Sequence, residues 1–131
     1  MPSTSETTAW ALLQGQQFMN LFTYRKTGEA VKTPVWFAQR GEKLYVTTTM
    51  SAGKIKRIRN NSRVLVGPAD RSGRPLGPTS DGQARVLSAS EASLAKDALD
   101  DKYGLFKAVF DFFGTVRGID RAYIEITPVE R

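Results

Sequence analysis

Hydroxyl and cationic side chains follow one another in the segment VTTTMSAGKIKRIR, residues 46–59. Thr47, Thr48 and Thr49 end a stretch of alternating polarity that predicts a β-strand, and they offer hydroxyl donors. Ser51 is expected to cap the helix that follows, whose first backbone amides would point at an anion. The helix dipole would favour a negative charge there by about 0.3–1 kcal/mol. The order of these residues predicts a phosphate site where a strand passes into a helix.

The helix predicted after the threonines carries cations on two faces. Ile55 and Ile58, three residues apart, define its buried face, and Lys54 and Arg57 flank that face. We expect Lys54 and Arg57 to be phosphate ligands. The cations expected on the solvent side are Lys56 and Arg59. The alternative is an ordinary solvated basic helix, and the threonine run is the feature that favours the phosphate.

The composition excludes several kinds of chemistry. The 131 residues include no cysteine and no histidine, which rules out disulfides, thiolate nucleophiles, histidine bases and the usual zinc or iron ligand sets. Redox chemistry would therefore need a bound organic cofactor, and no metal site is expected. The net charge of +6 favours an anionic partner, which could be a nucleic acid, a phosphorylated small molecule or a polycarboxylate.

The length of the chain fits one domain, residues 1–131, with residues 1–8 expected to be a loose N-terminus. A chain this short favours a site shared between two subunits. No apolar run approaches the ~20 residues of a membrane span, and the N-terminus does not resemble a signal peptide. We therefore expect a cytoplasmic protein that does not bind a membrane.

Short alternating and periodic segments predict a barrel of strands with helices over its openings. The expected strands are residues 16–25, 30–39, 43–49, 63–67, 83–88 and 121–127. The expected helices are residues 9–13, the basic segment after Ser51, a helix that Ser90 caps and that ends at Tyr103, and residues 105–116. The third helix has an apolar stripe of Leu94, Ala95, Ala98 and Leu99. The expected fold is mainly β (α+β), a six-stranded antiparallel barrel with three or four flanking helices.

Pro34 stands inside the strand segment TPVWFA, where it cannot donate to a ladder. Proline in a strand is normally found at an edge or a bulge, so neighbouring backbone groups would be available. A planar heterocycle could bind to the backbone of residues 33–36. The alternatives are that Pro34 only guards an edge against aggregation and that Trp36 only fills the core.

Three segments carry a resemblance to a known family: FTYRKTGEAVKTPVWFA, KLYVTTTMSAGKIKRIRNNSRVLVGPADRSGRPLGP and LDDKYGLFK. Taken in order, they resemble the pyridoxamine 5'-phosphate oxidase-like split-barrel superfamily. More narrowly, they resemble its deazaflavin-dependent branch, which uses coenzyme F420. The resemblance covers residues 16–131. It implies a six-stranded split barrel of the FMN-binding type and a homodimer with two cofactor sites at the interface.

The resemblance also implies where a cofactor lies. The residues that it places beside the ring system are Thr33, Pro34, Val35 and Trp36. The residues that it places on the phosphate side are Thr47, Thr48, Thr49, Ser51, Lys54 and Arg57. Coenzyme F420 is the expected cofactor and flavin mononucleotide (FMN) is the alternative. The deazaflavin carries a phosphodiester and a polyglutamate tail, whereas FMN carries a terminal phosphate. The chain lacks the histidine of the true pyridoxamine phosphate oxidases, which argues against pyridoxal phosphate synthesis.

The function expected from the residues and the resemblance together is hydride transfer from a reduced deazaflavin to an unidentified, electron-poor small-molecule acceptor. No catalytic residue is assigned, and the proton donor could be water, Tyr24 or Tyr103. The alternatives are an FMN-binding oxidoreductase of the same fold and a deazaflavin carrier without turnover. A nucleic-acid partner is not expected, because aromatic residues are not interleaved with the basic ones.

Overall fold

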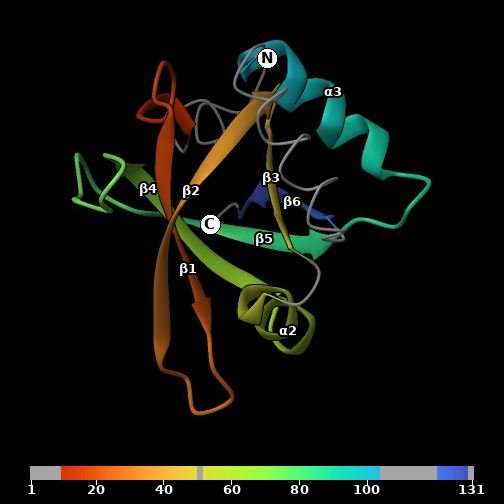
Figure 1. Ribbon diagram of the computed structural model, residues 1–131. Helices are drawn as coiled ribbons and strands as arrows, with labels where there is room; N and C mark the ends of the chain where they lie inside the picture. The colour runs from red at the N-terminus through yellow and green to blue at the C-terminus, as the bar shows by residue number, and fades with distance from the viewer. Residues whose placement is uncertain (1–9, 50–51, 104–120, 130–131) are drawn as a thin grey trace.

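Six antiparallel strands form a closed barrel in the computed structural model, which describes residues 10–49, 52–103 and 121–129 (Figure 1). Around the barrel the strands follow the order β1, β2, β3, β6, β5, β4. Their bounds are β1 Phe18–Tyr24, β2 Ala30–Arg40, β3 Lys43–Thr49, β4 Arg63–Ala69, β5 Ser80–Val86 and β6 Arg121–Pro128. The predicted six-stranded antiparallel barrel is thereby confirmed.

Alternation along the strands separates the barrel interior from its outer face. In β1, Met19, Leu21 and Thr23 are buried, and Met19 and Leu21 belong to the main core cluster. In β6, Ala122, Ile124 and Ile126 point into the same core, as the sequence predicts. Cross-strand neighbours share a face, so the odd residues of β1 and β2 line the interior.

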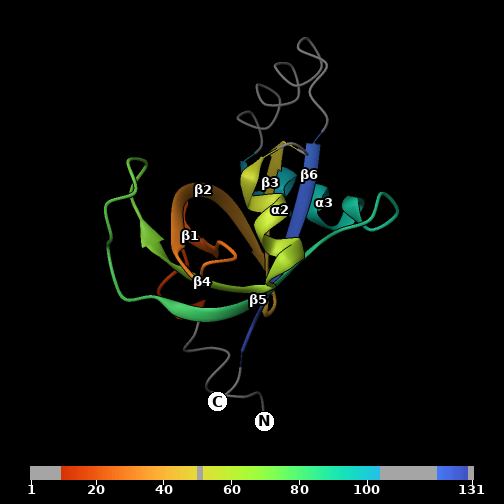
Figure 2. The ribbon, with the colours of Figure 1, turned by 90° about the horizontal axis from the view of Figure 1, so that it is seen from below.

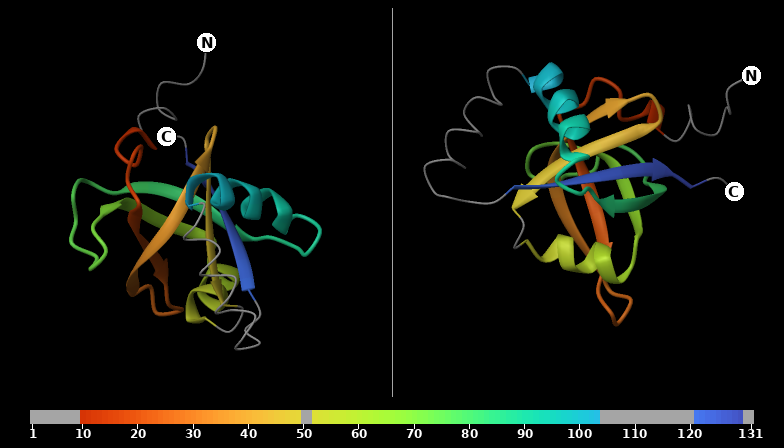
Figure 3. Two further views of the ribbon diagram at one scale, coloured as in Figure 1. Left: turned by 45° about the horizontal axis from the view of Figure 1, so that its top comes forward. Right: turned by 90° about the vertical axis from the view of Figure 1, so that its right-hand side faces the viewer.

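The helices α2 and α3 lie on opposite sides of the barrel, with α2 over one end and α3 against the outer face (Figures 1 and 3). The helix α2, Gly53–Asn60, buries Ile55 and Ile58 in the interior core, as its spacing predicts. The helix α3, Ala92–Tyr103, packs Ala95, Ala98 and Leu99 on the outer face of the barrel, beside Ala38 and Tyr45. Neither described helix has the length and apolar character needed to cross a membrane.

Some predicted boundaries were wrong. The N-cap of α2 is Ala52, which makes no side-chain cap hydrogen bond; Ser51 lies outside the described residues. Before α3, the backbone amide and the hydroxyl of Ser88 both donate to Oε1 of Glu91, and the helix begins at Ala92 rather than directly after Ser90. The side chain of Leu94 is 52% exposed and is not part of the buried stripe.

The strand β5 begins at Ser80 rather than at Gln83, and it ends at Val86 rather than at Ser88. The earlier start follows from the pairing of β5 with β4, where Ser80 lies opposite Val66 and Asp81 opposite Leu65. Two predicted helices fall wholly or partly outside the described residues. Residues 105–116 are not described, and of residues 9–13 only Trp10 and Ala11 are described as helical.

Candidate functional site

The strands β2 and β3 diverge at the place where the predicted cofactor residues lie. Their ladder runs from Arg40 opposite Lys43 to Phe37 opposite Val46 and does not continue. Beyond it, residues 33–36 of β2 pair with β1, whereas residues 47–49 of β3 pair with β6. The residues predicted beside the ring system therefore lie on β2, and the threonines predicted beside the phosphate lie on β3, at the point where these two strands separate. We call this point the fork in the sheet.

The register also explains the position of Pro34. It lies opposite Asn20 in an uninterrupted β1–β2 register, and β3 does not pair with this part of β2. A proline in a strand is normally found at a sheet edge or at a bulge, and Pro34 lies at an edge. Its side chain is exposed.

The predicted residues are divided between the two faces of the sheet. Val35 packs against the interior core, whereas Trp36 packs against the outer cluster under α3. Alternation places Thr33 and Val35 inward, with Pro34 and Trp36 outward. On β3, Val46 is in the core, so alternation places Thr48 inward. Thr47 and Thr49 point outward.

The helix α2 brings two cations to inward-facing hydroxyls on different strands. The Nζ of Lys54 donates to Oγ1 of Thr48 at 3.4 Å. The Nε of Arg57 donates to Oγ1 of Thr23 at 2.7 Å. Figure 2 shows α2 lying between β1 on one side and β3 and β6 on the other. The structure thus brings Lys54, Arg57 and Thr48 together at the α2 end of the barrel, and it adds Thr23.

The two cations are half-buried, whereas Lys56 and Arg59 are exposed, as the helical spacing predicts. Burial, and then the neighbouring charge of Arg57, lower the pKa of Lys54 below its usual value. Among the described residues no carboxylate forms an ion pair with Lys54 or Arg57. Two adjacent, partly desolvated cations without an acid are an arrangement that an anion would stabilise.

Thr23 was not predicted as a site residue. Its side chain is 0% exposed and stands in the inward series of β1 after Met19 and Leu21. A single hydroxyl in an apolar inward series needs a hydrogen-bond partner, and this was the available signal. Of the two tyrosines considered as proton donors, Tyr24 ends β1 on the outer face, and the side chain of Tyr103 is not described.

The loop between β4 and β5 packs against the outer face beside Pro34. The carbonyl of Gly73 accepts hydrogen bonds from Nδ2 of Asn20 at 2.9 Å and from Nζ of Lys32 at 3.2 Å. Asp70 fixes the turn, because its Oδ1 accepts hydrogen bonds from the backbone amides of Ser72 and Arg74. The loop therefore covers Asn20, which is 2% exposed.

Replacing Gly73 with alanine is expected to destabilise the protein by about 1–3 kcal/mol, because the backbone has φ +90° there. A Cβ would also lie 3.3 Å from Oδ1 of Asn20 and 3.6 Å from Cγ of Pro34. Gly28→Ala is the matched control, with φ +92° and nothing within 4 Å of its Cβ. Chemical denaturation should give a larger loss for Gly73→Ala. Equal losses would show that the loop contact adds nothing to the backbone strain.

Comparison with known proteins places this barrel in a family. The family model described as pyridoxamine 5'-phosphate oxidase matches residues 6–130. The chain belongs to this family. A comparison with curated proteins found no match.

Several solved structures share the fold of this pyridoxamine 5'-phosphate oxidase family member. A protein described as an F420 reductase is 22% identical, with a TM-score of 0.62, over 99% of this chain and 97% of its own. An FAD-binding protein from Mesorhizobium loti is 18% identical, with a TM-score of 0.67, over 98% and 90%. HutZ, a heme storage protein from Vibrio cholerae, is 15% identical, with a TM-score of 0.69, over 100% and 93%. At these identities the likeness concerns the fold alone.

Proposed function

We propose that this protein is an F420-dependent oxidoreductase, which transfers a hydride between a reduced deazaflavin and an electron-poor organic acceptor. The observation that carries the proposal is the pair of half-buried cations on α2, Lys54 and Arg57, which have no carboxylate partner among the described residues. They lie beside a fork in the sheet where backbone edges diverge. Family membership and a structural neighbour described as an F420 reductase support the same proposal.

The residues present fit a phosphodiester. Lys54 and Arg57 supply positive charge, and the hydroxyl of Thr48 lies beside the Lys54 ammonium. Arg57 is held by Thr23, so its orientation is fixed before any ligand arrives. When bound, the deazaflavin would supply the carbon that gives or accepts the hydride.

The chain's own contribution would be binding and orientation. The edge at residues 33–36 of β2 would border the ring system, while the α2 cations hold the phosphodiester. Fixing two reactants in a reactive arrangement can lower a barrier by roughly 7–11 kcal/mol, so an enzyme without histidine is physically reasonable. Solvent water would deliver the proton that follows the hydride.

Two other functions have support from specific observations. FMN, through its terminal phosphate, would also fit the cations, and a structural neighbour is described as FAD-binding. The second alternative is a deazaflavin carrier without turnover, and a structural neighbour described as a heme storage protein supports it. We further propose a cytoplasmic homodimer with the cofactor at its interface, since a chain of 131 residues is short for a self-contained catalytic cleft.

The deciding experiment is a fluorescence titration of the cofactor-free protein with F420 and, separately, with FMN. We expect micromolar or tighter binding of F420 and at least tenfold weaker binding of FMN. Stopped-flow oxidation of the reduced, bound deazaflavin by electron-poor acceptors would then separate enzyme from carrier. Preference for FMN would replace the proposal with the flavin alternative. Oxidation no faster than in buffer for any acceptor would favour the carrier.

A further inference from the structure

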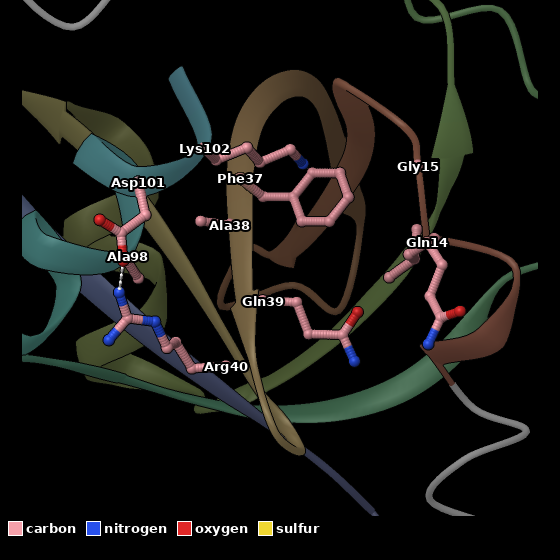
Figure 4. A pocket seen from close by; sticks show the side chains of 10 residues that line it. Gln14, Gly15, Phe37, Ala38, Gln39, Arg40, Ala98, Asp101 and Lys102 are labelled. Atoms are coloured by element: carbon pink, nitrogen blue, oxygen red, sulfur yellow. Dashed lines mark hydrogen bonds and ion pairs between the residues drawn. The ribbon is translucent and has the colours of Figure 1, made fainter. Parts of the chain in front are cut away.

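A second candidate site lies away from α2, beside the C-terminal end of α3. A cleft of about 310 Å³ opens there, at the small end of the range for small-molecule sites. In the described part of the chain, the β1–β2 register ends at Phe18 opposite Trp36, so residues 37–40 of β2 have a neighbouring strand only on the β3 side. The other walls are residues 13–15 and the end of α3 (Figure 4).

The ammonium group of Lys102 lines this cleft. Its Nζ lies 3.6 Å from the centroid of the Phe37 ring and donates to the carbonyl oxygen of Gln16 at 2.6 Å. The residue as a whole is exposed, so these contacts desolvate mainly its charged end. This desolvation lowers the pKa of Lys102 to about 8. An anion beside the amine would favour its charged form again.

Among the described residues that line the cleft, the other two charged side chains compensate one another. Arg40 and Asp101, which both line it, form an ion pair at its border (Figure 4). The three charged side chains that the structure describes in the lining therefore sum to one positive charge. This balance suits a monoanion better than a phosphate dianion.

Two carboxamides offer hydrogen-bond donors to such an anion. Gln14 lines the cleft from the N-terminal segment and Gln39 lines it from β2 (Figure 4). The Nε2 of Gln39 donates to the carbonyl oxygen of Gly41 at 3.0 Å, and an amide nitrogen carries two hydrogens, so one remains for a ligand. Alanine and leucine side chains complete the lining and would contact an apolar body.

We propose that this cleft binds a small monocarboxylate, with Lys102 as its counter-ion and with Gln14 and Gln39 as hydrogen-bond donors. A carboxylate has one charge and two acceptor oxygens, which matches one ammonium and two amide donors. None of the residues assigned to the cofactor takes part. The site therefore goes beyond the proposed function, and its test is independent of that function.

The test is an NMR titration of the full chain with benzoate and with neutral benzamide, which have the same ring and differ in charge. We expect benzoate to shift the side-chain amide signals of Gln14 and Gln39 saturably, and benzamide to bind at least tenfold more weakly. Benzoate affinity should fall as the pH rises from 7 to 9, because Lys102 loses its proton near pH 8. Equal binding of the two probes would overturn the proposal.

Substitutions at the cleft test whether benzoate binds beside Lys102. Lys102→Gln is expected to lower benzoate affinity at least tenfold, whereas Lys96→Gln, an exposed position on the same helix, should leave it unchanged. An unchanged affinity in Lys102→Gln would also overturn the proposal. If that variant does not fold, the exposed Gln14→Ala serves instead. It should weaken benzoate binding about threefold by loss of one hydrogen bond, and no change would contradict the proposal.

Discussion

Replacing Lys54 and Arg57 together with alanine is expected to weaken F420 binding at least about 100-fold. Each charged hydrogen bond to the phosphodiester should contribute about 1.5–3 kcal/mol, and 1.4 kcal/mol corresponds to a factor of ten in affinity. Both side chains are half-buried and lie against inward-facing hydroxyls, so solvent screens them less than exposed cations. Fluorescence titration at 0.15 M salt measures the loss.

The matched control is Lys56→Ala with Arg59→Ala. It removes the same charge from the same helix, but at exposed positions. We expect a loss below about fivefold, and a smaller one at higher salt, because exposed charges are screened over about 8 Å at physiological ionic strength. Circular dichroism checks that both double variants fold. Equal losses in the two would mean that only the long-range field attracts the ligand, and the site assignment would be wrong.

The pH dependence of binding gives a separate readout of Lys54. Burial and the charge of Arg57 lower its pKa in the unliganded protein, and a bound anion would raise that pKa again. Affinity should therefore fall as the pH rises through the lowered pKa, before an ordinary lysine would lose its proton. Lys54→Ala should remove this part of the pH dependence.

Local pattern was enough to predict most of the barrel. The alternation of Ala122, Ile124 and Ile126 placed β6 with its inward face correct, and the spacing of Ile55 and Ile58 fixed the orientation of α2. That orientation depends only on 3.6-residue periodicity, so the position of Lys54 at the border of the buried face followed from it.

The features that sequence could not supply depend on contacts between distant residues. The start of β5 is set by its pairing with β4, not by its own apolar residues. The fork between β2 and β3 is a property of three registers together. The hydrogen bond from Arg57 to Thr23 joins residues 34 positions apart, so the local pattern of β1 indicates that the Thr23 hydroxyl needs a partner but not which residue supplies it.

A buried acidic residue outside the cofactor site is expected to have the largest effect on stability. Glu125 is 4% exposed on the outer face of β6. Its Oε1 accepts a hydrogen bond from Nε of Arg85 at 3.0 Å, and its Oε2 accepts one from the hydroxyl of Tyr45 at 3.1 Å. Lys43 lies 3.7 Å from Oε2. Burial, and then the hydrogen bond to Glu125, raise the pKa of Tyr45. The carboxylate thus joins three neighbouring strands.

Glu125→Ala should therefore lower the free energy of unfolding by about 2–4 kcal/mol, because it leaves one buried hydroxyl unsatisfied, at about 1–3 kcal/mol, and removes buried methylene groups. The cationic partners Arg85 and Lys43 are half-exposed and stay solvated. The variant leaves the 4%-exposed Tyr45 without its acceptor and leaves a cavity beside it. Glu125→Gln keeps the shape and one acceptor oxygen, so we expect a loss nearer 1–3 kcal/mol. Glu91→Gln is the control, because Glu91 also pairs with Arg85 but lies at the surface, where an ion pair is worth roughly 0–1 kcal/mol. Chemical denaturation measures the free energy of unfolding of the three variants.

A loss in Glu125→Ala no greater than that in Glu91→Gln would contradict this prediction. It would mean that water satisfies Arg85 and Tyr45 when the carboxylate is removed, so that the buried position of Glu125 does not stabilise the fold.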